Sequence, residues 1–428
     1  MARIVVLGGA ESGVGAAVLA KVKGFDVFLS DFGQIKDEYV QTLRKWDIPF
    51  EQGGHTEGLI LNADEVIKSP GIPSTAPMVK KLADQGTHIV SEIEFASRYD
   101  SAKKICITGS NGKTTTTSLI YYLLKEAGLN AGLGGNIGKS YAMQVATEQH
   151  DYYVLEISSF QLDDTYDFRP DIAIITNITP DHLDRYGFCM DNYAKAKMRI
   201  AMNLRPEDVF IYDTDNPETM KQLGQSTPRC ILRPFAADSD ILNIPEDELS
   251  LKGRHNLYNC MAATLAARAA GVPEEVIGRT LRTFKPIEHR LELVRTLDGV
   301  TYINDSKATN VDAAWYALDA QTGPVVWIVG GGDKGNDYEV LKPLVKRKVK
   351  AIVCLGIENG KFHEAFEPIV GADRMYDTRD TADAVARCRE FASEGDVVLL
   401  SPCCTSFDLF TCYEQRGDVF REAVEQLK

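Results

Sequence analysis

The segment 104–117 carries the strongest chemical signal in this sequence. Its apolar start is followed by Gly-Ser-Asn-Gly-Lys-Thr-Thr at residues 109–115 and then by a helical pattern over residues 118–127. A strand, a glycine loop and a helix N-terminus together present backbone N–H groups that bind a polyphosphate. In such a loop Lys113 reaches the β- and γ-phosphates, and the hydroxyl of Thr114 binds Mg²⁺. The two glycines lie two residues closer together than in the common phosphate loop, which favours ligases over GTPases or motor proteins.

Further polar groups follow other apolar runs of the central segment. Glu156 closes the run 152–155, where a phosphate-loop ATPase has its second Mg²⁺ anchor, although a solvated acid could also stand there. His182 lies beyond another strand-like run and could ligate a metal or be a hydrogen-bonded core histidine. Its neighbours Asp181 and Asp184 favour a site.

Amines and amides supply further candidates. Lys195 and Lys197 lie two residues apart on an expected helix, so only one of them can readily face a cleft. Taken singly, each would ordinarily be interpreted as a solvent-exposed surface lysine. Asn136 stands in a glycine turn and is suited to orient a carboxylate or a phosphate. Asn256 and Asn259 lie three apart on one helical face, where they could frame an adenine or a ribose.

A dense polar cluster marks the start of the last third of the chain. Arg290 precedes the strand-like run 301–304, and Asp305, Lys307 and Thr309 follow this run directly. Clusters of this density after a strand are rarely only structural. We therefore expect these residues to belong to a site.

The first segment must position its polar groups through a βαβ unit. Strand-like runs at 4–7 and 26–29 flank a glycine loop and the helical pattern 16–23, and Asp31 follows the second run. This arrangement resembles a dinucleotide fold, but Ala10 replaces the middle glycine of the usual fingerprint. The loop could bind NAD(P) or simply pack a helix on a strand. We favour a third interpretation, in which the N-terminus of the helix that follows the loop binds a nucleotide diphosphate.

Alternation of β and α patterns continues to the end of the chain and predicts an α/β protein of three domains. Such alternation gives mostly parallel sheets that bind ligands at the carboxyl ends of their strands. We expect a Rossmann-like domain over residues 1–92, a central phosphate-loop ATPase-like domain over 93–285 and a Rossmann-like C-terminal domain over 286–428. The active site is then expected between domains.

Composition narrows the class of protein. The 428 residues carry 61 acidic and 47 basic side chains, a formal net charge of −14 that argues against non-specific nucleic-acid binding. No apolar run approaches the roughly 20 residues that span a bilayer. The nine cysteines show neither zinc spacing nor a paired motif. Because no secretory signal is recognisable either, we expect a cytoplasmic enzyme without membrane insertion.

Taken together, these motifs resemble those of the Mur ligases, the ATP-dependent enzymes that build the peptidoglycan stem peptide. The resemblance covers nearly the whole chain, in the family's order, and rests on residues 109–115, 156–161, 181–182, 255–259 and 304–310. Within the family, three features resemble the member that adds D-glutamate to UDP-N-acetylmuramoyl-L-alanine. These are the Rossmann-like first domain with Asp31, the Asn-Asp-Ser-Lys-Ala-Thr-Asn sequence at 304–310, and the tail at 401–410 with 414–417.

The resemblance implies roles for individual residues. It places the catalytic machinery at Lys113, Glu156, His182 and Lys197. It assigns ATP to Gly109, Ser110, Asn111, Gly112, Lys113, Thr114, Thr115, Asn256, Asn259, Arg290, Asp305 and Lys307. It assigns Mg²⁺, as one or two ions, to Thr114, Glu156, His182 and a carbamylated Lys197.

It also implies three groups of substrate-binding residues. Those for the uracil end are Glu11, Ser12, Asp31, Phe32 and Gly33, with Ser69 as a further substrate-binding position. Those for the muramoyl-alanine end are Asn136, Ser158 and Gln161. Those for D-glutamate are Thr309, Lys334, Ser406, Phe407 and Tyr413.

Alternatives remain open at this stage. The chain could be another Mur-type or folylpolyglutamate-type amide ligase, a nucleotide-dependent oxidoreductase, or a non-catalytic nucleotide-binding protein. No hydride-transfer site supports the oxidoreductase. We expect a monomer whose partners are ATP, UDP-N-acetylmuramoyl-L-alanine and D-glutamate, and no nucleic acid.

Overall fold

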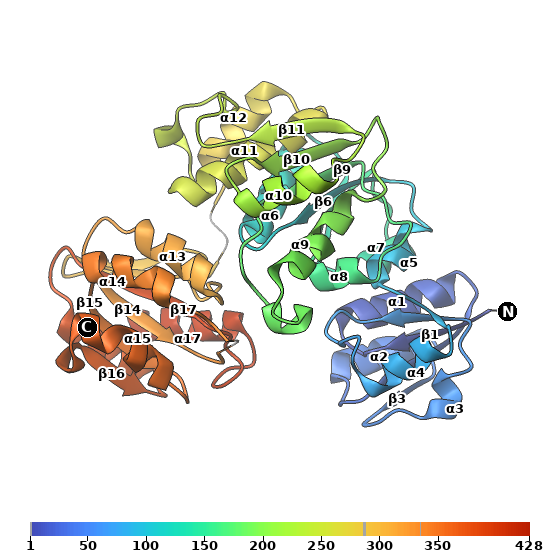
Figure 1. Ribbon diagram of the computed structural model, residues 1–428, viewed down its shortest axis with the longest axis horizontal. Helices are drawn as coiled ribbons and strands as arrows, with labels where there is room; N and C mark the ends of the chain where they lie inside the picture. Colours follow the sequence, from blue (N-terminus) through green and yellow to red (C-terminus); the bar gives the residue numbers. More distant parts are fainter. Residues whose placement is uncertain (1, 286–287, 334) are drawn as a thin grey trace. The chain divides into compact units, whose positions relative to one another are not determined.

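The computed structural model describes residues 2–285, 288–333 and 335–428, which form two compact units (Figure 1). The first unit comprises Met1–Ile178, Arg185–Lys252 and Asn256–Phe284. The second comprises Thr179–Asp184, Gly253–His255 and Lys285–Lys428.

The first unit opens with a five-stranded parallel sheet in the order β3-β2-β1-β4-β5. Its strands are β1 (Arg3–Leu7), β2 (Asp26–Asp31), β3 (Phe50–Gln52), β4 (Glu65–Lys68) and β5 (His88–Val90). Its helices are α1 (Glu11–Val22), α2 (Asp37–Lys45), α3 (Glu57–Ile60), α4 (Pro77–Asp84) and α5 (Glu92–Ser97). The central strand β1 is almost completely buried, as a parallel strand covered on both faces must be.

The second sheet of this unit has six parallel strands in the order β11-β10-β9-β6-β8-β7. Its strands are β6 (Lys103–Thr108), β7 (Ala131–Gly135), β8 (Tyr152–Glu156), β9 (Ile172–Ile175), β10 (Val209–Asp213) and β11 (Ile231–Phe235). The helices are α6 (Lys113–Glu126), α7 (Tyr141–Thr147), α8 (Ser159–Asp163), α9 (Met190–Met198), α10 (Pro217–Gln225), α11 (Arg254–Ala269) and α12 (Glu274–Thr283). The strand β6 lies between β8 and β9, so three carboxyl ends meet at one edge of the sheet.

The second unit contains the third sheet, in the order β12-β13-β17-β14-β15-β16. Its strands are β12 (Glu292–Leu297), β13 (Val300–Asn304), β14 (Val325–Gly330), β15 (Val349–Leu355), β16 (Met375–Thr378) and β17 (Val397–Cys403). Its helices are α13 (Val311–Asp319), α14 (Lys342–Lys348), α15 (Gly360–Val370), α16 (Thr381–Phe391) and α17 (Tyr413–Glu425). Trp327 packs in one apolar cluster with side chains of α13, α14 and α15, while its neighbour Ile328 packs in another with α16 and α17. Both faces of the sheet are therefore covered.

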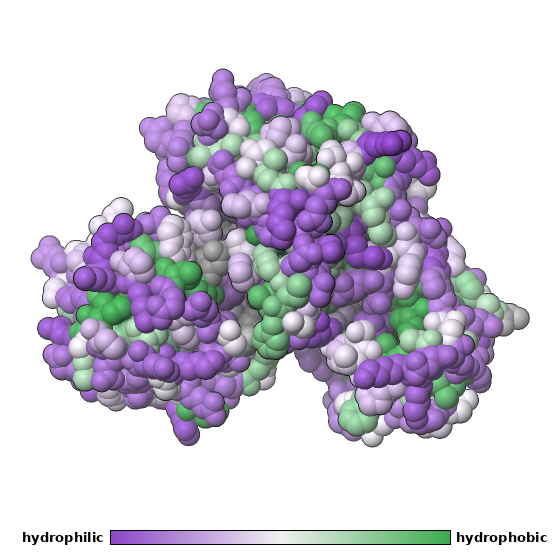
Figure 2. Space-filling model, in the orientation of Figure 1, coloured by the Kyte–Doolittle hydropathy of each residue, from purple (hydrophilic) through white to green (hydrophobic). Residues whose placement is uncertain are grey.

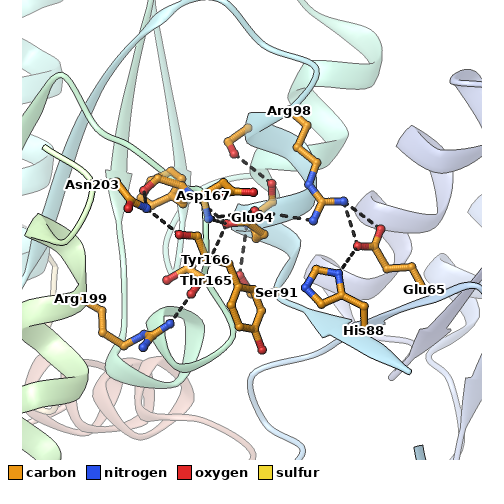
Figure 3. Close-up of polar contacts among 12 residues, drawn as sticks. Glu65, His88, Ser91, Glu94, Arg98, Thr165, Tyr166, Asp167, Arg199 and Asn203 are labelled. Atoms are coloured by element: carbon orange, nitrogen blue, oxygen red, sulfur yellow. Dashed lines mark hydrogen bonds and ion pairs between the residues drawn. The ribbon is translucent and has the colours of Figure 1, made fainter. Parts of the chain in front are cut away.

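A polar network joins the first two sheets through α5 (Figure 3). The fully buried carboxylate of Glu94 accepts the backbone N–H groups of Tyr166 at 3.0 Å and of Phe168 at 2.9 Å. Arg98, one turn later, lies 3.6 Å from Glu94 and donates to Glu65 of β4 at 2.9 Å. Because a buried carboxylate without partners is costly, this network fixes α5 against the segment that precedes β9.

The architecture confirms the predicted fold class, an α/β protein of three domains with mostly parallel sheets. The boundaries at residues 92 and 285 stay a prediction. Within the described residues no helix is both long and apolar enough to cross a membrane, and the face seen in Figure 2 is largely hydrophilic.

A second buried acid lies at the start of α5. Glu92 accepts hydrogen bonds from Ser140 Oγ at 2.7 Å and from the N–H of Ala142 at 2.8 Å, while its Oε2 has no partner among the described residues. Burial raises the pKa of Glu92 from 4.5 to about 7, although both hydrogen bonds oppose the shift. The folded protein thus holds this proton more tightly than the unfolded chain does. The contribution of protonated Glu92 to the free energy of unfolding is therefore lost as the pH rises from 4.5 to about 7.

We predict that Glu92→Gln flattens this dependence, because glutamine does not titrate. Ionisation of Glu92 accounts for up to about 3 kcal/mol of the free energy of unfolding. The measurement is the thermal unfolding midpoint between about pH 5 and about pH 8. The exposed Glu57→Gln is the control and should keep the wild-type slope. An unchanged slope in Glu92→Gln would contradict the assignment.

Candidate active site

The loop after β6 has the geometry that binds a phosphate chain. Gly112 adopts φ +80° and leads directly into α6, so the first backbone N–H groups of a long helix point to the loop. Lys113 Nζ donates to the carbonyl oxygens of Gly109 and Ser110, both at 2.9 Å. Lys197 Nζ, from α9, donates to the same Gly109 oxygen at 2.7 Å. Two ammonium groups and a helix N-terminus at one loop favour an anion strongly.

The end of β9 holds this loop in shape. The backbone N–H of Ser110 donates to the carbonyl of Asn177 at 2.9 Å, and that of Asn111 donates to Asn177 Oδ1 at 2.9 Å. Thr176 Oγ1 donates to the Asn111 carbonyl at 2.6 Å. The sequence prediction missed Thr176 and Asn177 as part of the site. They could have been predicted, because these two polar residues directly follow β9, which pairs with the phosphate-loop strand β6.

Glu156, at the end of β8, offers a cation site beside the loop strand. Its side chain is 1% exposed, and its Oε1 accepts a hydrogen bond from Asn136 Nδ2 at 2.8 Å. The other oxygen, Oε2, is buried without a hydrogen-bond partner in the described part of the chain. A carboxylate oxygen in this state fits a divalent cation, which prefers oxygen ligands. Thr114, at the first turn of α6, is also buried.

The two lysines of α9 lie in contrasting environments. Lys197 is 2% exposed, and its Nζ lies 4.6 Å from the ring centre of Tyr193. Lys195 is 59% exposed at its side chain and pairs with Asp191 at 2.7 Å. The expectation that only one of them turns inward is confirmed, and the buried one is Lys197.

Two predicted pairs of residues have local structural partners. Ser158 and Gln161 form a capping box at the start of α8, in which Gln161 Oε1 accepts from the N–H of Ser158 at 2.9 Å. Asn259 Nδ2 donates to Asn256 Oδ1 at 3.1 Å, and Asn259 Oδ1 accepts from Thr116 Oγ1 of α6 at 3.3 Å. The asparagine pair therefore contacts the helix that carries the phosphate loop.

At the first sheet, Asp31 organises the glycine turn. Its carboxylate accepts the N–H of Gly9 at 2.5 Å and that of Gly33 at 2.7 Å. Because both oxygens bind backbone, Asp31 fixes the β1–α1 turn to the end of β2. Phe32 is 75% exposed beside this turn, with its ring centre 5.7 Å from that of His55.

The other predicted residues of this segment differ in exposure. Glu11 is exposed, and its Oε1 accepts the backbone N–H of Ser140 at 2.9 Å, which links α1 to the start of α7. Ser12 is half-buried. Ser69 is buried at the end of β4, and its hydroxyl lies 3.5 Å from the carbonyl oxygen of Gly8.

In the second unit, the loops after β13 and β17 bring polar groups to one edge of the third sheet. Asp305 is buried and accepts from the N–H of Leu291 and from Ser401 Oγ, both at 3.1 Å. Burial raises the pKa of Asp305 to about 7, although Arg290 and these hydrogen bonds oppose the shift. Burial and the positive charge of Arg290 lower the pKa of His255 to about 4. Arg290 thus lies near an aspartate and a histidine whose pKa values are both shifted by burial in the direction that favours the neutral form.

The predicted D-glutamate residues fall mainly on these loops. Tyr413 is the first residue of α17, and its ring centre lies 3.8 Å from the Nζ of Lys307, a residue that was assigned to ATP. Ser406 is buried, whereas Phe407 is 74% exposed. Thr309 is half-buried, and Lys334 lies outside the described residues.

Arg416 joins the two loops and was not predicted. Its buried guanidinium donates to Ser306 Oγ at 2.9 Å, to the Ser306 carbonyl at 2.8 Å and to the Cys404 carbonyl at 3.3 Å. Burial lowers the pKa of Arg416 to about 10. The segment 414–417, which contains Arg416, was part of the family resemblance, but it does not indicate the contacts with Ser306 and Cys404.

His182 belongs to the second unit. It adopts φ +51°, and its Nε2 lies 3.7 Å from Asp181 Oδ2. Asp181 Oδ2 accepts a hydrogen bond from Asn310 Nδ2 at 3.0 Å, so this segment is tied to the start of α13.

Comparison with known proteins assigns the chain to a family. Three family profiles match in order: a MurD N-terminal domain over residues 4–78, a Mur ligase middle domain over 107–244 and a Mur ligase glutamate ligase domain over 289–404. The chain is 53% identical over its whole length to a UDP-N-acetylmuramoylalanine--D-glutamate ligase of Bacteroides fragilis, all of which is covered. The same identity and coverage hold for the ligase of that name from Bacteroides thetaiotaomicron. The chain belongs to the Mur ligase family.

Solved structures at low sequence identity share the fold. A UDP-N-acetylmuramate-alanine ligase from Thermotoga maritima matches with a TM-score of 0.64 at 19% identity, with full coverage of both chains. A folylpolyglutamate synthase from Mycobacterium tuberculosis matches with a TM-score of 0.60 at 15% identity, over 76% of this chain and 91% of its own. The predicted family and enzyme class are confirmed, and family membership decides against the oxidoreductase.

We predict that Gly112→Ala weakens polyphosphate binding at least about tenfold, with ATP as the probe. A Cβ at Gly112 would lie 2.2 Å from Asn259 Oδ1 and would displace the contact between loop and α11. Gly128→Ala is the matched control, because Gly128 ends the same helix at φ +77° with nothing within 4 Å of its Cβ position.

Both variants strain the backbone at a positive φ and should lower the unfolding temperature, Gly112→Ala by more because of its additional clash with Asn259. Only Gly112→Ala should lose ATP affinity in calorimetric titration. Equal affinities in the two variants would contradict the role given to this loop.

Proposed function

We propose that this chain is an ATP-dependent ligase that joins D-glutamate to the alanine carboxylate of UDP-N-acetylmuramoyl-L-alanine. The full-length match at 53% identity to ligases of that name carries the choice of substrates. The phosphate loop and the buried Glu156 support the chemistry.

The reaction needs ATP because a carboxylate resists attack by an amine. Its oxide is too poor a leaving group to be expelled. Transfer of the γ-phosphoryl group to a carboxylate oxygen gives an acyl phosphate and ADP. The amine of D-glutamate then attacks the carbonyl carbon, and phosphate leaves from the tetrahedral intermediate with that oxygen. No protein nucleophile is required, so catalysis consists of positioning and of stabilising phosphoryl charge.

In this proposal the phosphate loop holds the triphosphate. Incoming phosphate oxygens replace the Gly109 carbonyl as acceptor for Lys113, and the backbone N–H groups at the start of α6 bind the same chain. Mg²⁺ would be held by Thr114, Glu156 and His182, with Lys197 as a carbamate, and it would supply charge neutralisation at the phosphates. A carbamate forms when an unprotonated lysine amine adds to carbon dioxide, and it replaces a cation by a carboxylate-like metal ligand.

Substrate contacts complete the proposal. The turn at Asp31 and Phe32 would receive the uracil end, and Asn136 would face the muramoyl-alanine end. The loop with Thr309, together with Ser406 and its neighbours, would receive D-glutamate. The cytoplasmic location and the monomeric state expected from the sequence belong to the same proposal.

The direct test is ADP release with UDP-N-acetylmuramoyl-L-alanine and a panel of amino acids. D-Glutamate should support turnover at least about a hundredfold better than L-alanine, L-lysine, diaminopimelate or L-glutamate. Lys113→Ala should lose at least about a hundredfold in kcat and serves as the inactive control. Turnover with another amino acid but not with D-glutamate, or with a folate in place of the nucleotide sugar, would overturn the choice of substrates.

We predict that Lys197→Ala loses most of the activity and regains part of it on addition of a short-chain carboxylic acid. The added carboxylate would take the place of the carbamate as a metal ligand. Lys195→Ala is the control, because this exposed lysine on the same helix pairs with Asp191 at the surface. Absence of recovery in Lys197→Ala would leave a role as an ordinary ammonium group and would contradict the carbamate.

A further inference from the structure

One edge of the third sheet gathers three different metal-binding side chains. Cys354 of β15 and Asp377 of β16 are register partners in adjacent parallel strands, so their side chains lie on the same face. His363 of α15 lies over them, with its Nε2 at 3.0 Å from Asp377 Oδ2. One ligand atom from each of these three residues lies within 4.8 Å of the other two. Figure 1 shows α15, β15 and β16 together in this part of the unit.

A fourth residue orients the histidine. Glu367, one turn after His363 on α15, has its Oε2 at 2.8 Å from His363 Nδ1. With Nδ1–H donating a hydrogen bond to Glu367, a metal ion would take the place of the Nε2 proton that faces Asp377. Metal-binding histidines commonly have such a carboxylate on the distal nitrogen, where it fixes the tautomer and the ring orientation.

The donor set selects the ion. A thiolate, an imidazole and a carboxylate suit Zn²⁺ and similar borderline ions, whereas Mg²⁺ requires oxygen ligands in octahedral geometry. In a tetrahedral zinc site, bonds of about 2.0–2.3 Å separate the ligand atoms by roughly 3.5 Å. The ligand atoms of Cys354, His363 and Asp377, which lie within 4.8 Å of one another, could reach this separation by rotation of their side chains. Cys354 is fully buried while Asp377 is 53% exposed at its side chain, which leaves a route for entry.

We propose that Cys354, His363 and Asp377 form a zinc-class metal site that is separate from the phosphate loop and clamps α15 to the edge of the third sheet. β16 is the last strand of this sheet and pairs only with β15. A metal bonded to both strands and to the connecting helix stabilises this edge, because only the folded unit presents all three ligands together. Water completes the coordination.

The test uses Co²⁺ as a spectroscopic substitute for Zn²⁺ in the full chain, with excess Mg²⁺ present to occupy oxygen-rich sites. Wild-type protein should bind one equivalent with a thiolate-to-cobalt charge-transfer band in the near ultraviolet, and added Zn²⁺ should abolish the band. Zn²⁺ alone should also raise the unfolding temperature. A wild-type protein without this band overturns the proposal.

Three variants locate the site. Cys354→Ala should lose the band, and His363→Gln should weaken Co²⁺ binding at least about tenfold. Cys388→Ala is the matched control, because Cys388 is equally buried in the same unit but lies outside the cluster, and it should keep the band. If Cys354→Ala fails to fold, His363→Gln decides, because its side chain is partly exposed. Wild-type affinity in His363→Gln, or a band that persists in Cys354→Ala, shows that other residues bind the metal and overturns the assignment.

Discussion

The carbonyl oxygen of Gly109 accepts hydrogen bonds from two lysines that lie far apart in the sequence, and the site depends on this convergence. Lys113 comes from the helix that follows the loop, and Lys197 comes from α9. The Lys113 ammonium group and the N-terminus of α6 favour an anion at this loop. Lys197 lies at the same carbonyl, where the proposed carbamate would hold the cation that accompanies the phosphates. This arrangement suits a phosphate chain. It also explains why the neighbouring strands must hold it: β9 supplies Thr176 and Asn177, and β8 supplies Glu156.

Much of this arrangement follows from sequence. The apolar runs 4–7 and 152–155 located the strands β1 and β8, because a parallel strand buried on both faces must be apolar throughout. The phosphate loop and Glu156 could be placed because a strand end fixes where the next polar residue emerges. The contrast between Lys195 and Lys197 followed from helical periodicity, and the structure shows which lysine is buried.

Other elements escaped prediction for physical reasons. The edge strand β11 contains Pro234, and β7 is rich in glycine. Both residue types are disfavoured inside strands, so neither segment was predicted as a strand. The hairpin of β12 and β13 was missed although Asp298 and Gly299 form an Asp-Gly turn, both with positive φ. Long-range partners were inaccessible in principle. The sequence around Arg416 does not indicate its contact with Ser306, and the sequence around Glu11 does not indicate its hydrogen bond with the backbone of Ser140. The zinc-class cluster is of the same kind, since its three ligands are spread over two strands and a helix.

In the proposed reaction, ATP held at the phosphate loop phosphorylates the alanine carboxylate. The decisive experiment uses UDP-N-acetylmuramoyl-L-alanine whose carboxylate oxygens carry a heavy isotope, incubated with ATP, D-glutamate and Mg²⁺. Each amide bond formed should deliver one labelled oxygen to the released phosphate, detected by mass spectrometry. Formation of the amide together with unlabelled phosphate would rule out the acyl phosphate, because the carboxylate oxygen would then have left by another route.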